Sequence, residues 1–116
     1  MLSFKELIVW QKSMTLVKFV YQISRKLPVE ERYGLASQMQ RCAVSIPSNI
    51  AEGNKRTTAK DYAQFLRMAS GSAAELETQL LLIKDVYNLD VSKELGLLEE
   101  IQKMLQVMKR KLQPTT

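Results

Sequence analysis

Apolar residues recur every three or four positions along nearly the whole chain, and this spacing constrains the fold more than any other feature. The clearest stripe opens the sequence, in the order Leu7, Trp10, Met14, Val17 and Tyr21. Side chains at this spacing share one face of an α-helix. No stretch alternates apolar and polar residues between turn dipeptides as β-strands do. The sequence therefore predicts an all-α protein.

Short interruptions divide this pattern into four segments. We expect helices at residues 4–26, 31–52, 58–87 and 92–112. A helix of about 20 residues spans about 30 Å, and short connections favour antiparallel neighbours. The 116 residues, 46% of them hydrophobic and 25% charged, suit one domain with its own core. We predict a single antiparallel, up-down-up-down four-helix bundle over residues 1–116.

The first expected helix has two apolar faces. A second stripe of Leu16, Val20, Ile23 and Leu27 runs beside the first one. Two such faces offer more apolar surface than the core of one small bundle needs, and exposed apolar patches usually mark interfaces. A head-to-tail interface that closes on itself forms a ring. We therefore expect the protein to form a homo-oligomer.

Local signals predict where the helices begin and end. Ser3 and Glu6 have the spacing of a capping box, and Thr58 has the position of an N-cap. Pro28 should end the first helix, because the residue before a proline avoids the helical region. Gly53 should end the second helix as a left-handed C-cap.

Pro47 lies inside the second expected helix. An interior proline removes one backbone hydrogen bond and costs about 3 kcal/mol, so either other contacts offset this cost or the helix bends there. The third helix has a run of small residues at 69–74, centred near Gly71. We expect this run to face residues 45–49, so that the two helices cross closely at the bend. The alternative is that small residues only relieve crowding at the crossing.

The chain is basic, with 17 Lys and Arg residues against 12 Asp and Glu and a net charge of +5. Such an excess favours anionic partners. The candidate nucleic-acid contacts are Lys12, Lys18, Arg25, Lys26, Lys55, Arg56 and Lys60. Lys109, Arg110 and Lys111 form a further cluster near the end of the chain. The alternative for each cluster is a solvated helix face, or cations that complement a helix C-terminus.

Catalysis is the hypothesis that the composition disfavours most. The chain has no histidine, and thus lacks the usual general base near neutral pH and a common metal ligand. Cys42 is the only cysteine and lies on an apolar stripe, where a packing role is expected. The four glycines are isolated and form no phosphate-binding loop. We expect no enzymatic activity, no metal and no cofactor.

The sequence also bears on location. The longest apolar runs are far shorter than the roughly 20 residues that cross a membrane, and the N-terminal residues are charged where a signal peptide is apolar. A single cysteine suits a reducing compartment. We expect a cytoplasmic protein without membrane contact.

Several motifs together resemble a known family. They are Phe4-Lys5-Glu6-Leu7, Val9-Trp10-Gln11-Lys12, Leu27-Pro28, Glu31-Arg32-Tyr33-Gly34-Leu35, Gln38, Arg41, Ser45-Ile46-Pro47-Ser48-Asn49-Ile50-Ala51-Glu52-Gly53, Phe65-Leu66, Gly71-Ser72 and Glu75-Leu76. In this order they resemble the bacterial four-helix bundle proteins encoded in intervening sequences of 23S ribosomal RNA genes. The resemblance implies a ring-like homopentamer. It also implies a relationship to the accessory protein of diversity-generating retroelements, which works with a reverse transcriptase and binds nucleic acid.

We therefore expect a non-enzymatic homo-oligomer that binds RNA or a ribonucleoprotein through basic surfaces. The alternative is an adaptor that holds a protein partner in an apolar groove, with no direct role for nucleic acid. A further set of residues is expected to satisfy polar groups near the bend or to line a subunit interface. This set is Gln38, Arg41, Ser45, Pro47, Ser48, Asn49, Glu52, Gly53 and Gly71.

Overall fold

Four long helices account for most of the computed structural model, which describes residues 3–113. In chain order the elements are the 3-10 helix η1 (Phe4–Glu6), α1 (Ile8–Ser24), the 3-10 helix η2 (Val29–Glu31), α2 (Leu35–Asn54), α3 (Ala59–Tyr87) and α4 (Ser92–Lys111). No strand occurs among these residues. The predicted all-α, four-helix fold is confirmed. The outermost residues of the predicted domain, 1–2 and 114–116, lie outside the described part.

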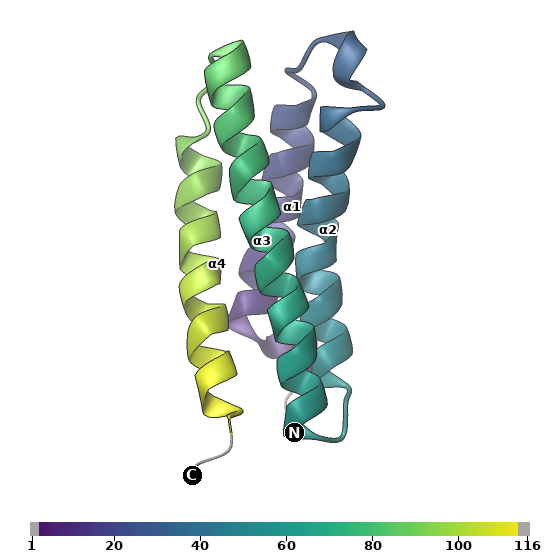
Figure 1. The fold of residues 1–116 in the computed structure, drawn as a ribbon, viewed down its shortest axis with the longest axis vertical. Helices are drawn as coiled ribbons and strands as arrows, with labels where there is room; N and C mark the ends of the chain where they lie inside the picture. The colour runs from purple at the N-terminus through teal and green to yellow at the C-terminus, as the bar shows by residue number, and fades with distance from the viewer. Residues whose placement is uncertain (1–2, 114–116) are drawn as a thin grey trace.

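Consecutive helices run in opposite directions, as Figure 1 shows. Contacts join α1 to α2, α2 to α3, α3 to α4 and α4 back to α1, so each helix packs against two neighbours. The Cα atoms span 49 × 23 × 20 Å. One end of this long bundle carries the start of α1, the α2–α3 connection and the end of α4. The other end carries the α1–α2 and α3–α4 connections.

The core lies along the axis between the four helices. The core contains all residues of the predicted second stripe of the first helix and most stripe residues of the other three helices. Ala69 and Ala73 of α3 are fully buried, as are Ile46 and Ile50 of α2. The other stripe of α1 is only half covered, and Met14 and Tyr21 are each 38% exposed. One face of α1 therefore packs into the core, and the other remains partly exposed, as expected of a face that contacts another subunit.

The first helix is shorter than predicted. Instead of one helix over 4–26, η1 is followed by extended backbone at Leu7, and α1 ends at Ser24. Ser3 caps η1 rather than α1, since its hydroxyl accepts a hydrogen bond from the Lys5 amide at 3.2 Å. The break at Leu7 accompanies edge-on packing of Phe4 against Trp10, with ring centroids 5.3 Å apart. A tertiary aromatic contact thus accompanies the departure from a continuous helix.

The second helix is shifted relative to the prediction of 31–52. Residues 29–31 form η2 and Gly34 is not helical, so α2 begins at Leu35 and continues to Asn54. The predicted left-handed cap at Gly53 is wrong, because Gly53 is inside the helix and no glycine in the described residues has a positive φ. A Cβ on Gly53 would lie 2.9 Å from the Cβ of Phe65 and 2.9 Å from Cδ1 of Tyr62. Gly53 is required by close approach to α3, not by turn geometry.

Candidate functional site

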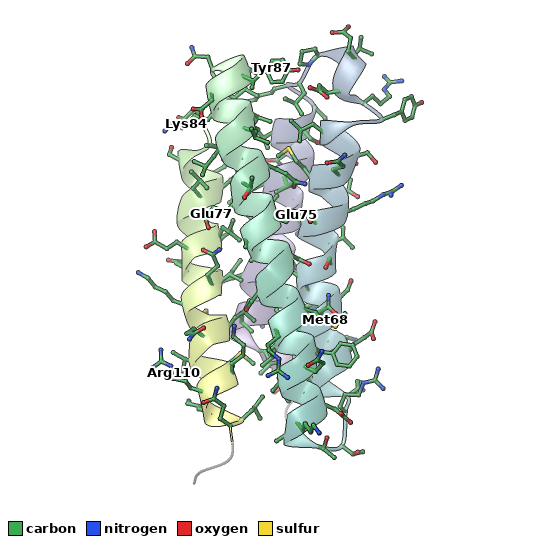
Figure 2. The ribbon with its side chains drawn as sticks, in the orientation of Figure 1. Met68, Glu75, Glu77, Lys84, Tyr87 and Arg110 are labelled. Atoms are coloured by element: carbon green, nitrogen blue, oxygen red, sulfur yellow. The ribbon has the colours of Figure 1, made fainter. Side chains whose placement is uncertain are left out.

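The predicted basic residues do not form one surface, because the fold sends them to different parts of the bundle. Lys55, Arg56 and Lys60 lie at the α2–α3 connection. Lys109, Arg110 and Lys111 form the last turn of α4, at the same end of the molecule. Figure 2 places Arg110 at this end. We call these six residues the basic end.

Aromatic side chains support part of the basic end. The Arg56 guanidinium lies 4.6 Å from the centroid of the Phe65 ring, and Nζ of Lys55 lies 5.9 Å from that of Phe4. Arg56 also approaches Glu52 at 3.6 Å, but both side chains are about half exposed, so water screens the pair. Within residues 3–113, the other five cations of the basic end have no carboxylate within 4.0 Å. The end therefore retains most of its positive charge for an external anion.

The remaining predicted contacts are dispersed. Lys12 forms an ion pair with Glu100 at 3.0 Å, which links α1 to α4. Lys18 is exposed on α1, whereas Arg25 and Lys26 follow α1 at the far end of the bundle. Figure 1 shows that this far end is separated from the basic end by the length of the helices. A single nucleic-acid strand would have to run along the whole molecule to contact all seven predicted residues.

The predicted encounter between α2 and α3 is confirmed. The hydroxyls of Ser45 and Ser72 lie 2.5 Å apart, which joins the 45–49 stretch to the 69–74 run. Nδ2 of Asn49 donates to the carbonyl of Ser45 at 2.8 Å and contacts its hydroxyl oxygen at 3.2 Å. Pro47 is buried within an uninterrupted α2. These polar residues satisfy one another around the proline, as expected of a structural network.

Cys42 and Glu75 extend this network toward the far end. The Cys42 thiol donates to Oε2 of Glu75 at 2.5 Å, and Figure 2 shows Glu75 on the side of α3 that faces α2. Burial, followed by the hydrogen bond and the negative charge of Glu75, raises the pKa of the Cys42 thiol to about 12, and a hydrogen bond with Gln79 opposes part of this shift. A thiol held in its protonated form is a poor nucleophile near neutral pH. The geometry favours the packing role predicted for Cys42.

Other members of the predicted structural set face solvent. Gln38, Arg41, Ser48 and Glu52 are exposed on α2. Gly71 is exposed as well, and a Cβ there would have no neighbour within 4 Å. The described chain therefore does not explain a glycine in the middle of α3, where glycine costs about 1 kcal/mol relative to alanine.

The positions of two surface grooves were not predicted. A groove between α1 and α2 is lined by Tyr21, Arg41 and Val44, and an apolar groove between α1 and α4 is lined by Ile8, Met104 and Val107 among others. The excess of apolar stripes in the sequence signalled that some face would stay uncovered. It did not indicate which face, because that depends on how far each helix rotates toward the core.

No group of three or more His, Cys, Asp or Glu side chains within residues 3–113 is placed to hold a metal ion. No helix in that part of the chain is both long enough and apolar enough to cross a membrane.

Comparisons with known proteins identify a family and a fold. The family model described as 23S rRNA-intervening sequence protein matches residues 5–110. A solved structure of a protein with unknown function from the S23 ribosomal protein family of Bacteroides thetaiotaomicron is 21% identical. It superposes with a TM-score of 0.66, and the match covers 90% of this chain and 94% of that one. A search of curated proteins finds no match.

Proposed function

The chain belongs to the 23S rRNA-intervening sequence protein family, and on this premise we propose that it is a non-enzymatic homo-oligomer that binds RNA through its basic end. The observation that carries the proposal is the gathering of Lys55, Arg56 and Lys60 with residues 109–111, which are distant in sequence. Clustered Lys and Arg side chains bind phosphates and release counterions from the nucleic acid. A ribonucleoprotein would present the same phosphates.

Self-association strengthens this surface. The α1–α2 side exposes Met14, Tyr21 and Val44 and carries Lys18 and Arg41. The exposed side of α3 presents Met68, Leu82 and Val86, and it carries charges of both signs in Arg67 and Asp85. Both sides are apolar, so each can cover the other in a neighbouring copy.

A contact between two different faces is head-to-tail, and it closes into a ring when the rotation between copies permits. Cyclic symmetry then places the same end of every copy on one face of the ring. The basic end would be repeated around that face, and its field would grow with the number of copies. The number five follows from the family resemblance.

Salt dependence tests the proposal. We expect a fluorescently labelled single-stranded RNA to bind at low salt, with log Kd changing by about 0.7 per neutralised phosphate for each unit of log salt concentration. The triple variant Lys55→Ala/Arg56→Ala/Lys60→Ala should bind more weakly and show a shallower slope. The matched control is Lys26→Ala/Lys84→Ala/Lys93→Ala, which removes the same charge at the far end of the bundle. Equal losses in both variants, or no binding by the parent protein, would contradict the proposal.

An adaptor function is the second candidate, and the α1–α4 groove favours it. Leu7, Ile8, Met104, Val107 and Met108 line this groove of about 360 Å³. Its rim holds Lys103 and Lys111. An amphipathic helix with acidic flanks matches that combination of apolar floor and basic rim. Val107→Ser, which adds no charge beside Lys111, should weaken binding of such a helix while leaving RNA affinity within a factor of about two, which separates the two functions.

A further inference from the structure

Apart from the two grooves, a cavity lies at the end of the bundle opposite the basic end, where the chain passes from α1 to α2. It has a volume of about 360 Å³ and is lined by Ser24, Arg25, Leu27, Pro28, Arg32 and Gln40, among others. Ligand pockets in proteins usually begin at about 300 Å³. The cavity is therefore large enough for a small ligand.

Two arginine residues line this cavity. Arg25 follows the last turn of α1, and Arg32 follows η2. Both residues are exposed, and within residues 3–113 neither has a carboxylate within 4.0 Å. Arg25 can be understood as a cation at a helix C-terminus. Arg32 has no such explanation.

The carboxylate adjacent to Arg32 in sequence is engaged elsewhere. The Tyr87 hydroxyl donates to Oε2 of Glu31 at 2.5 Å, and the Leu35 amide lies 3.4 Å from its Oε1. The hydrogen bond to Glu31 raises the pKa of Tyr87, so the hydroxyl stays protonated and remains a donor. Glu30 is exposed and forms no ion pair in the described part of the chain. Tyr87 thus holds Glu31 by a contact to α3, which leaves Arg32 available.

One hydrogen bond within α1 and one between α1 and α2 hold the wall of the cavity in place. The buried Ser24 hydroxyl donates to the Tyr21 carbonyl at 2.9 Å and accepts from Nε2 of Gln40 at 2.9 Å. Leu27 and Pro28 contribute an apolar surface beside the two arginines. The cavity wall is therefore held in place, and two arginines line it together with apolar side chains.

We propose that this cavity binds a terminal phosphate monoester, as found on a nucleoside monophosphate or on the 5′ end of an RNA strand. A monoester carries close to two negative charges near neutral pH, which matches two guanidinium groups better than the single charge of a backbone diester. Arginine binds phosphate oxygens through two parallel N–H donors. The apolar wall would contact the sugar or base. For an RNA ligand, this inference rests on the proposed RNA function. It specifies that the far end of the bundle recognises the phosphate at the 5′ end of the RNA.

Two oligonucleotides of identical sequence test the proposal, one with a 5′-phosphate and one with a 5′-hydroxyl. The phosphorylated strand should bind about tenfold more tightly, equivalent to one charge-assisted hydrogen bond. Arg25→Gln/Arg32→Gln should remove this preference, so that the variant binds the two strands with equal affinity. Arg67→Gln is the control, because Arg67 is exposed on α3 and does not line the cavity. It should keep the preference.

A second measurement separates this inference from the proposed function. Uridine 5′-monophosphate and uridine are each titrated into isotopically labelled protein, and the side-chain Nε resonances of Arg25 and Arg32 are followed. Shifts with the nucleotide alone support the site even if no RNA binds. RNA binding without any 5′-phosphate preference and without nucleotide shifts would overturn the site, while the RNA function of the basic end would stand.

Discussion

Gly53 and Gly71 show that glycines in similar helical surroundings have different roles. A Cβ at Gly53 would lie 2.9 Å from the Cβ of Phe65, which cannot move without its backbone. At Gly71 nothing lies within 4 Å. The first glycine is explained by packing within one chain. The second is not, which is the pattern expected where a neighbouring copy approaches closely.

These two positions give a matched pair of substitutions. Gly53→Ala should lower the free energy of unfolding by about 1–3 kcal/mol, because the added methyl group overpacks the α2–α3 contact. Gly71→Ala should raise the stability of the single chain by up to about 1 kcal/mol, because alanine favours the helix. Urea denaturation measures both. If Gly53→Ala proves as stable as Gly71→Ala, α2 and α3 do not restrict each other at this point.

The raised pKa of Cys42 predicts a dependence of stability on pH. The thiol has an ordinary pKa of 9.0 and a folded value of about 12. Its contribution to stability is therefore fully present below pH 9 and is lost as the pH rises from about 9 toward 12. The difference in unfolding free energy between the parent and Cys42→Ala should shrink over this range. A constant difference would show that the thiol titrates normally in the fold.

The same residue should resist alkylation. Iodoacetamide should modify Cys42 at pH 8 far more slowly in the native protein than in urea, because only the thiolate reacts. Glu75→Gln should raise the native rate only slightly, since burial is the largest cause of the shift. Mass spectrometry follows the modification. Equal rates in native and unfolded protein would indicate an accessible thiolate.

At the level of elements, α2 carries the most unusual sequence. It runs without a break from Leu35 to Asn54 across Pro47, and the side chain of Asn49 bonds the Ser45 carbonyl in the same turn. We predict that Pro47→Ala keeps the helix, straightens it and disturbs the oligomer more than the single-chain fold. Circular dichroism and light scattering measure the two effects. An unchanged mass together with an unchanged melting temperature would show that the proline is incidental.

The ends of the third and fourth helices were predicted best. The predicted third and fourth helices, 58–87 and 92–112, each differ from α3 and α4 by one residue at one end. Thr58 caps α3 by accepting from the Asp61 amide at 3.1 Å, and Asn88 ends it in the left-handed region. The first two helices were predicted less well. Their ends depend on the packing of Phe4 against Trp10 and on the backbone conformation at Gly34. Neither feature can be inferred from the spacing of apolar residues.

The same distinction applies to the candidate site. The encounter of Ser45 with Ser72 was predictable, because small residues at matching heights of adjacent antiparallel helices favour close packing. The basic end was only partly predictable. Lys60 and Lys111 are far apart in sequence and share an end only because α4 returns antiparallel to α3. The pairing of Lys12 with Glu100 likewise depends on the contact between α1 and α4.

For the whole molecule, the decisive question is whether two different faces join the copies. Val44 is 40% exposed on the α1–α2 side, and Leu82 is 46% exposed on α3. A charge placed in a buried apolar interface is strongly unfavourable, so Val44→Asp and Leu82→Asp should each prevent assembly. Val107→Asp on α4 is the control and should leave the mass unchanged, because Val107 belongs to neither face.

Mixing the two variants distinguishes the kinds of contact. Each variant retains the face that the other has lost, so in a head-to-tail assembly an equimolar mixture forms a heterodimer with one intact interface and stops there. In a symmetric contact between identical faces, one variant alone would still assemble. Light scattering on the parent should give a multiple of the 13.3 kDa chain mass, and a ring of five gives five times that mass. A parent protein that is monomeric at micromolar concentration would remove the ring, and with it the repeated basic face on which strong RNA binding depends.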